Sequence, residues 1–69
     1  MEHTTKDRIL QELALRTGDI EAIYLGLSEY YDLCADVEAK PMIYLTRGGV
    51  FFCGIPVYRT DMPKHFKLY

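Results

Sequence analysis

The stretch Ile20-Glu21-Ala22-Ile23-Tyr24-Leu25-Gly26 decides between two folds. As a helix it would begin at Asp19 and continue at helical spacing to Cys34, forming a helical hairpin with the segment before it. As a strand it is a short β-branched and aromatic run closed by Gly26, a residue that costs about 1 kcal/mol inside a helix. Since Ser28 is a favourable N-cap for a new helix, we expect a strand over 20–25 and a helix over Ser28–Glu38.

The segment before this stretch predicts a first helix. Thr4, with Asp7 three residues later, is typical of a helix N-terminus, because the threonine hydroxyl can accept a hydrogen bond from a free amide. Apolar residues then recur at helical spacing, and Gly18 tolerates the left-handed backbone that often ends a helix. We therefore expect a helix from about Thr5 to Arg16.

After Lys40-Pro41 the hydrophobic pattern changes to that of strands. Met42–Thr46 and Val50–Cys53 are strand-like runs separated by the tight turn Arg47-Gly48-Gly49, which predicts a β-hairpin. The chain should stay extended over Gly54–Arg59. Within that segment Pro56 lacks an amide donor, which favours an edge strand or a bulge.

The last residues predict a loop and a final short strand. The loop covers Thr60–Pro63, and Lys64–Tyr69 alternates polar and apolar side chains. We expect a small α+β domain spanning residues 1–69, with two helices on one face of a largely antiparallel sheet of roughly three to five strands that contains the β-hairpin. The open side of the sheet should then be basic and aromatic. If 20–25 were helical, the fold would instead be two long helices over a hairpin.

Composition excludes several classes of protein. With 49% hydrophobic and 26% charged residues, the 69-residue chain is not disordered by composition. The longest apolar run, Gly49–Ile55, is far shorter than the roughly 20 residues of a membrane-spanning helix. The segment Met1–Arg8 is polar where a signal peptide is apolar. We expect a soluble, cytoplasmic protein.

The cysteines and histidines predict no metal or cofactor site. Cys34 and Cys53 are too far apart for a CxxC motif, and their apolar neighbours predict that both are buried, with a disulfide or a reactive thiol as the alternative. His3 and His65 have no second ligand at metal-binding spacing.

The net charge of −2 conceals two halves of opposite sign. Residues 1–38 hold nine acidic and three basic side chains, a formal charge of −6, whereas residues 39–69 hold five basic and one acidic, a charge of +4. Such asymmetry can attract a charged partner to one face, or pair two copies of the chain.

An interaction protein is the function these features favour. Six tyrosines and three phenylalanines are more than so small a core can hide, and exposed tyrosines are favoured at interfaces. The partner would be another protein or a second copy in a homo-oligomer. The candidate contact residues are Tyr30, Arg47, Tyr58, Arg59, Lys64 and Tyr69.

Two other functions are weaker alternatives. A nucleic-acid-binding module could use the basic, aromatic second half, in which Arg47, Arg59, Lys64 and Lys67 lie among aromatic side chains. Five basic residues beside an acidic half give such a module little positive charge for binding phosphates. An enzyme would need converging acid and base groups, and no spacing in the chain places two together, so we expect no catalytic residues.

Three local patterns resemble a known group of proteins. They are Ala22–Gly26 running into Ser28–Leu33, then Phe52–Val57, then Thr60–Pro63. In this order they are similar to small uncharacterised proteins of tailed bacteriophages and prophages, and more distantly to the peripheral domain of phage major capsid proteins. The resemblance implies a phage-type setting and a layout of strand, helix and hairpin. It implies no reaction and no shell-forming role, because the axial domain and extended arm of a capsid subunit have no counterpart in these residues.

Overall fold

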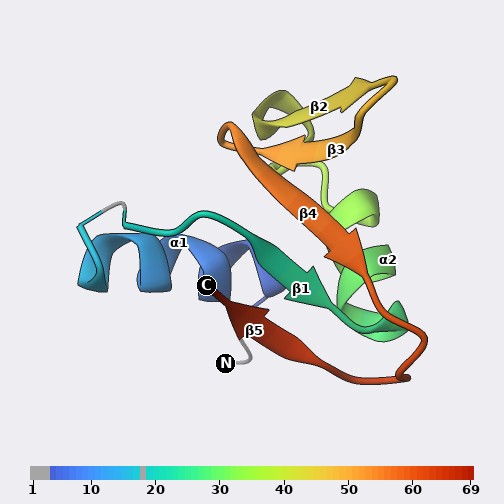
Figure 1. The fold of residues 1–69 in the computed structure, drawn as a ribbon. Helices are drawn as coiled ribbons and strands as arrows, with labels where there is room; N and C mark the ends of the chain where they lie inside the picture. Colours follow the sequence, from blue (N-terminus) through green and yellow to red (C-terminus); the bar gives the residue numbers. More distant parts are fainter. Residues whose placement is uncertain (1–3, 18) are drawn as a thin grey trace.

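The computed structural model describes residues 4–17 and 19–69, and they form two helices and a five-stranded sheet (Figure 1). This confirms the expected α+β fold. The elements are α1 (Thr5–Leu15), β1 (Ile23–Leu25), α2 (Leu27–Ala35), the 3-10 helix η1 (Lys40–Met42), β2 (Ile43–Thr46), β3 (Gly49–Phe52), β4 (Ile55–Arg59) and β5 (Phe66–Leu68).

The sheet has the strand order β2-β3-β4-β1-β5. Three of its four strand pairs are antiparallel, and β1 with β4 is the parallel pair. The two consecutive hairpins β2-β3-β4 make one half of the sheet. Strand β1 comes much earlier in the chain, yet it lies between β4 and β5 (Figure 1).

The stretch that decides the fold is a strand, as predicted, although it is shorter than expected. β1 covers Ile23–Leu25, whereas residues 20–22 lie outside any strand. The side chains of Ile23 and Leu25 are fully buried, while Tyr24 between them is half-buried. This alternation is that of a strand with one face on the core.

Helix α1 confirms the first predicted helix to within a residue. The Thr4 hydroxyl accepts a hydrogen bond from the amide of Asp7 at 3.2 Å, which is the predicted N-cap. Gly18, the predicted stop, lies outside the described residues. The preceding residue, Thr17, already has the left-handed φ of 52°.

Helix α2 starts one residue earlier and ends three residues sooner than predicted. Ser28 is not its N-cap, because Gly26 holds that position and the amides of Leu27 and Ser28 donate to carbonyls of the loop at Met62 and Pro63. At the other end the carboxylate of Asp36 accepts a hydrogen bond from the amide of Glu38 at 2.9 Å. This local turn competes with helical hydrogen bonding and ends the helix at Ala35.

The first hairpin is confirmed, but both cysteines are exposed, which corrects the prediction that they are buried. Cys53 and Gly54 form the two-residue loop between β3 and β4, with φ values of 52° and 80°. Positive φ at both positions is typical of the tight turn that suits a hairpin, so the Cys53 side chain leaves the sheet. Cys34 lies next to the buried Leu33 on α2, on the part of the helix turned to solvent.

Pro56 lies on an interior strand, so the prediction of an edge strand or a bulge is wrong. Its register with Phe51 of β3 is continuous. On the other side, β1 pairs with β4 only from Val57 onward. At Pro56 the strand therefore has one neighbour, and the missing amide costs no sheet hydrogen bond on the side of β1.

The core lies between one face of the sheet and the two helices, as predicted. Ile9 of α1 and Leu33 of α2 pack with the inward side chains of four strands. The buried hydrophobic residues are Ile9, Ile20, Ile23, Leu25, Leu33, Ala39, Phe52, Val57 and Leu68. Both helices therefore cover the same face of the sheet.

Gly26 lies where the backbone of the loop before β5 comes very close. A Cβ atom at this position would lie 2.5 Å from the amide nitrogen of His65 and 2.8 Å from the carbonyl oxygen of Met62. The Gly26 amide donates to the carbonyl of His65 at 2.8 Å. A side chain here would push the loop away from the junction of β1 and α2.

We expect Gly26→Ala to lower the free energy of unfolding by about 1–3 kcal/mol, because the added methyl group collides with backbone rather than with a flexible side chain. Urea denaturation followed by circular dichroism measures the change. Gly48→Ala is the matched control, since its Cβ would meet only the Thr46 hydroxyl, at 3.6 Å. Equal stability of the two variants would contradict the account of Gly26.

Candidate interaction surface

The face of the sheet opposite the helices carries a row of aromatic side chains. Tyr24 lies between the buried Ile23 and Leu25, and Tyr58 follows the buried Val57. Because strands alternate, both tyrosines point away from the core. The register places Tyr24 beside Tyr58 on one side and beside Lys67 on the other. Three neighbouring strands therefore contribute to one row.

The rings of Tyr24, Tyr58 and Tyr69, here called the tyrosine cluster, contact one another. Tyr24 stacks on Tyr58 with ring centroids 4.9 Å apart and meets Tyr69 edge-on at 5.2 Å. Both arrangements are favoured geometries for aromatic pairs. The Lys67 ammonium lies 5.2 Å from the centre of the Tyr69 ring. The cluster is thus an ordered, partly exposed platform with a positive charge beside it.

A second row extends this surface across the hairpins. The register aligns Tyr44, Phe51 and Pro56 on β2, β3 and β4, on the same face as the tyrosine cluster. Both rows together, which we call the open sheet face, comprise Tyr24, Tyr44, Phe51, Pro56, Tyr58, Lys67 and Tyr69. It is a broad surface, mostly aromatic, on which no described helix lies.

Two of the six predicted site residues, Tyr58 and Tyr69, lie in the tyrosine cluster. Tyr30 and Arg59 form a separate pair on the helix side, where the Arg59 guanidinium lies 5.7 Å from the centre of the Tyr30 ring. Partial burial raises the pKa of the Tyr30 hydroxyl above its ordinary value, and the neighbouring Cys34 adds to the shift.

The remaining two predicted residues lie in loops, away from the cluster. Arg47 is exposed in the turn between β2 and β3. Lys64 lies near the start of both helices, at a hollow that it shares with Arg8, Glu29 and Asp32. The predicted basic residues are therefore dispersed, and the open sheet face has Lys67 instead.

Tyr24, the centre of the cluster, was not among the predicted site residues. The signal that could have identified it is the alternation Ile23-Tyr24-Leu25, which in a strand turns the tyrosine away from two buried neighbours. Its partners could not be found that way, because the parallel pairing with Tyr58 joins segments far apart in the sequence.

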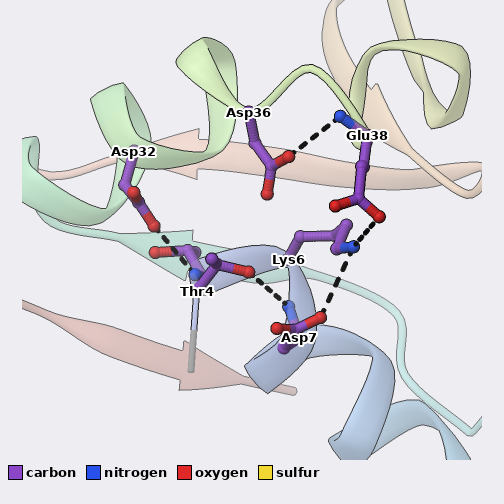
Figure 2. Close-up of polar contacts among 7 residues, drawn as sticks. Thr4, Lys6, Asp7, Asp32, Asp36 and Glu38 are labelled. Carbon is purple, nitrogen blue, oxygen red and sulfur yellow. Dashed lines mark hydrogen bonds and ion pairs between the residues drawn. The ribbon is translucent and has the colours of Figure 1, made fainter. Parts of the chain in front are cut away.

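A second candidate region is an acidic hollow of about 230 Å³ between the start of α1 and the end of α2 (Figure 2). Asp32 accepts a hydrogen bond from the amide of Thr5 at 2.8 Å. Lys6 lies 3.4 Å from carboxylate oxygens of both Asp7 and Glu38. These contacts hold α1 against α2 and the segment after it, so the charged residues of the hollow have a structural role.

Charge pairing shifts two pKa values in this hollow. Desolvation alone would lower the pKa of Lys6, but its hydrogen bond to Glu38 and the nearby carboxylates outweigh that and leave it raised. Desolvation would likewise raise the pKa of Asp7, but the Lys6 charge and the hydrogen bonds with Thr4 and Lys6 together outweigh it and leave the pKa lowered. Both shifts favour the charged forms.

Metal-binding and membrane-spanning features were sought in residues 4–17 and 19–69. No group of three histidine, cysteine or carboxylate side chains there could hold a metal ion. None of the helices in these residues is both long and apolar enough to cross a bilayer. Comparisons of the chain with protein-family models, with curated proteins and with solved structures found no match.

We expect Tyr24 and Tyr58 to be energetically coupled. A double-mutant cycle of Tyr24→Ala and Tyr58→Ala should give a coupling energy of about 0.5–1.5 kcal/mol in urea denaturation. Either single substitution already removes the stacked contact, so the double variant loses no more of it. The control cycle pairs Tyr24→Ala with Tyr44→Ala, since two strands separate β1 from β2. Coupling of the same size in both cycles would contradict a specific stacked pair.

We expect Lys6→Met to raise the pKa of Asp7 toward its ordinary value. The pKa of Asp7 is lowered in the folded chain, so its ion pair stabilises the fold above the unfolded pKa and loses that effect as the pH falls through the folded pKa. Loss of Lys6 should therefore flatten the fall in stability at acidic pH. An NMR titration of the Asp7 carboxyl measures the shift, and Lys40→Met is the control. An unchanged Asp7 titration would contradict the pairing.

Proposed function

We propose that this chain is a small, non-enzymatic accessory protein that acts by binding protein, either a larger partner or a second copy. The open sheet face makes the contact with the partner. The observation that carries this proposal is the tyrosine cluster, whose three rings are held together on a face that the helices leave open. Tyrosine gives a large contact area at low entropy cost and is enriched among the residues that dominate protein interfaces.

The geometry of the cluster suits such a contact. Tyr58 is 48% exposed although its ring is stacked on Tyr24, so it is already held in place while one side stays accessible. A partner would therefore lose little side-chain freedom in ordering it. The second row, from Tyr44 to Pro56, provides further apolar area beside the cluster.

The alternative is a nucleic-acid-binding module, in which bases stack on the same tyrosines. Lys67 beside Tyr69 is the observation that favours it. Against it, Arg59 lies on the helix side, and Arg47 and Lys64 lie in loops away from the cluster. A single lysine beside the cluster would neutralise few phosphates, so we favour a protein partner.

The biological setting is part of the proposal. The local likeness to small tailed-phage and prophage proteins supports an accessory role during phage growth, in the cytoplasm of the host cell. The acidic first half and basic second half add a means of orienting a charged partner.

A capture experiment with matched variants tests the proposal. The tagged chain, Tyr58→Ser and Tyr31→Ser are each immobilised and exposed to a nuclease-treated lysate of the host bacterium. Tyr31 is the control because it is a 60% exposed tyrosine on α2, away from the open sheet face. We expect a protein that the wild type and Tyr31→Ser both retain and that Tyr58→Ser retains at least about tenfold less.

Two results would overturn the proposed contact. One is equal retention by all three chains. The other is binding of single-stranded DNA or RNA oligonucleotides that weakens with salt and is lost in Tyr58→Ser, which would establish the nucleic-acid alternative.

A further inference from the structure

β2 is an edge strand whose side chains are largely exposed. It pairs with β3 on one side, and no described element pairs with it on the other. Leu45 is 80% exposed and Tyr44 is 65% exposed. In an antiparallel pair every second residue turns its amide and carbonyl to the open side, so β2 presents unpaired backbone groups beside apolar side chains.

β2 also lacks the features by which proteins protect an edge. Its sequence Ile43-Tyr44-Leu45-Thr46 contains no charged residue and no proline. The opposite edge strand, β5, is one residue shorter and has Lys67 at its centre. Charge at an edge strand discourages pairing, and β2 has none.

We propose that β2 pairs antiparallel with β2 of a second copy of this chain across a two-fold axis, joining the two sheets into one. An axis perpendicular to the sheet at Tyr44 places this tyrosine opposite Tyr44 of the second copy. Ile43 then lies opposite Leu45 of the second copy, and Leu45 lies opposite Ile43 of the second copy. Since residues directly opposite share a face, the apolar side chains meet on the helix side and the tyrosines meet on the open sheet face.

A hollow beside β2 supports a second copy as the occupant. It measures about 280 Å³ and is lined by Cys34, Lys40, Ile43 and Leu45, on the side of the sheet that carries the helices. In the two-fold arrangement Leu45 of the second copy arrives next to Ile43, at this hollow. A closed two-fold dimer is also the commonest form of soluble homo-oligomer, and it would cover both exposed leucines at once.

This dimer rests on the self-association included in the proposed function, but it is formed by the edge of β2 and not by the tyrosine cluster. Edge pairing would leave the cluster uncovered and bring the open faces of two copies into one plane. Tyr58→Ser should therefore leave the dimer intact, so the two proposals can fail separately.

Sedimentation velocity of the purified chain over a range of concentrations tests the dimer. We expect a monomer–dimer equilibrium that Leu45→Lys weakens about tenfold or more, because the variant places a charge opposite an apolar side chain at two symmetric sites. Leu15→Lys is the matched control, since Leu15 is 71% exposed on α1. A wild type that stays monomeric, or equal weakening by both lysine variants, overturns the proposal.

Disulfide trapping tests the register without relying on the stability of the lysine variant. In a chain with Cys34→Ser and Cys53→Ser, the further change Tyr44→Cys should give a disulfide-linked dimer under mild oxidation, because directly opposite Cβ atoms lie about 4.5–5.5 Å apart. Tyr58→Cys in the same background is the control, because β4 already has a neighbour on each side. No cross-link at position 44, or an equal one at position 58, overturns the two-fold pairing.

Discussion

The backbone contact at Gly26 is the constraint on which the rest of the fold depends. The loop after β4 folds back so closely that its carbonyls accept hydrogen bonds from Gly26, Leu27 and Ser28. The free amides at the start of α2 are thus satisfied by the main chain of a distant segment rather than by a capping side chain. In return, the carboxylate of Glu29 in the first turn of α2 accepts a hydrogen bond from the amide of His65 at 2.9 Å. Helix α2, β1 and the approach to β5 are therefore held by one junction, which tolerates no side chain at its centre.

The two faces of the sheet differ strongly. Both helices lie on one face, where they pack against the buried hydrophobic side chains of the sheet. The open sheet face carries mainly aromatic residues, which tolerate partial exposure. Tyr24 limits that exposure by contacting Tyr58 and Tyr69 at once, so the rings shield one another while their outer sides stay accessible. Neither α1 nor α2 covers this second face of the sheet.

The fold class and most elements could be predicted from sequence, because their signals are local. The Thr4 cap, the change of hydrophobic period after Pro41 and the tight turn before β3 each depend on a few neighbouring residues. Predictions failed where distant contacts decide the outcome. Ser28 is a good N-cap by type, yet its amide donates to the carbonyl of Pro63. Cys53 follows an apolar run, yet it lies in the turn to β4 and its side chain is exposed. The candidate site was found in part, since the aromatic surplus indicated Tyr58 and Tyr69 but could not indicate that β1 would place Tyr24 between them.

The position of β1 in the sheet has a consequence for the order in which the chain folds. Strands β2, β3 and β4 follow one another through two short turns, so their pairing closes small loops and can form early. The pairing of Ile23 with Val57 closes a loop of more than thirty residues. The partner of β1 on its other side, β5, lies still later in the sequence. Folding speed falls as contacts become less local, so the slow step should be the docking of the N-terminal half between β4 and β5. Until that step the sheet lacks β1, the strand between β4 and β5, and β4 is briefly a second open edge.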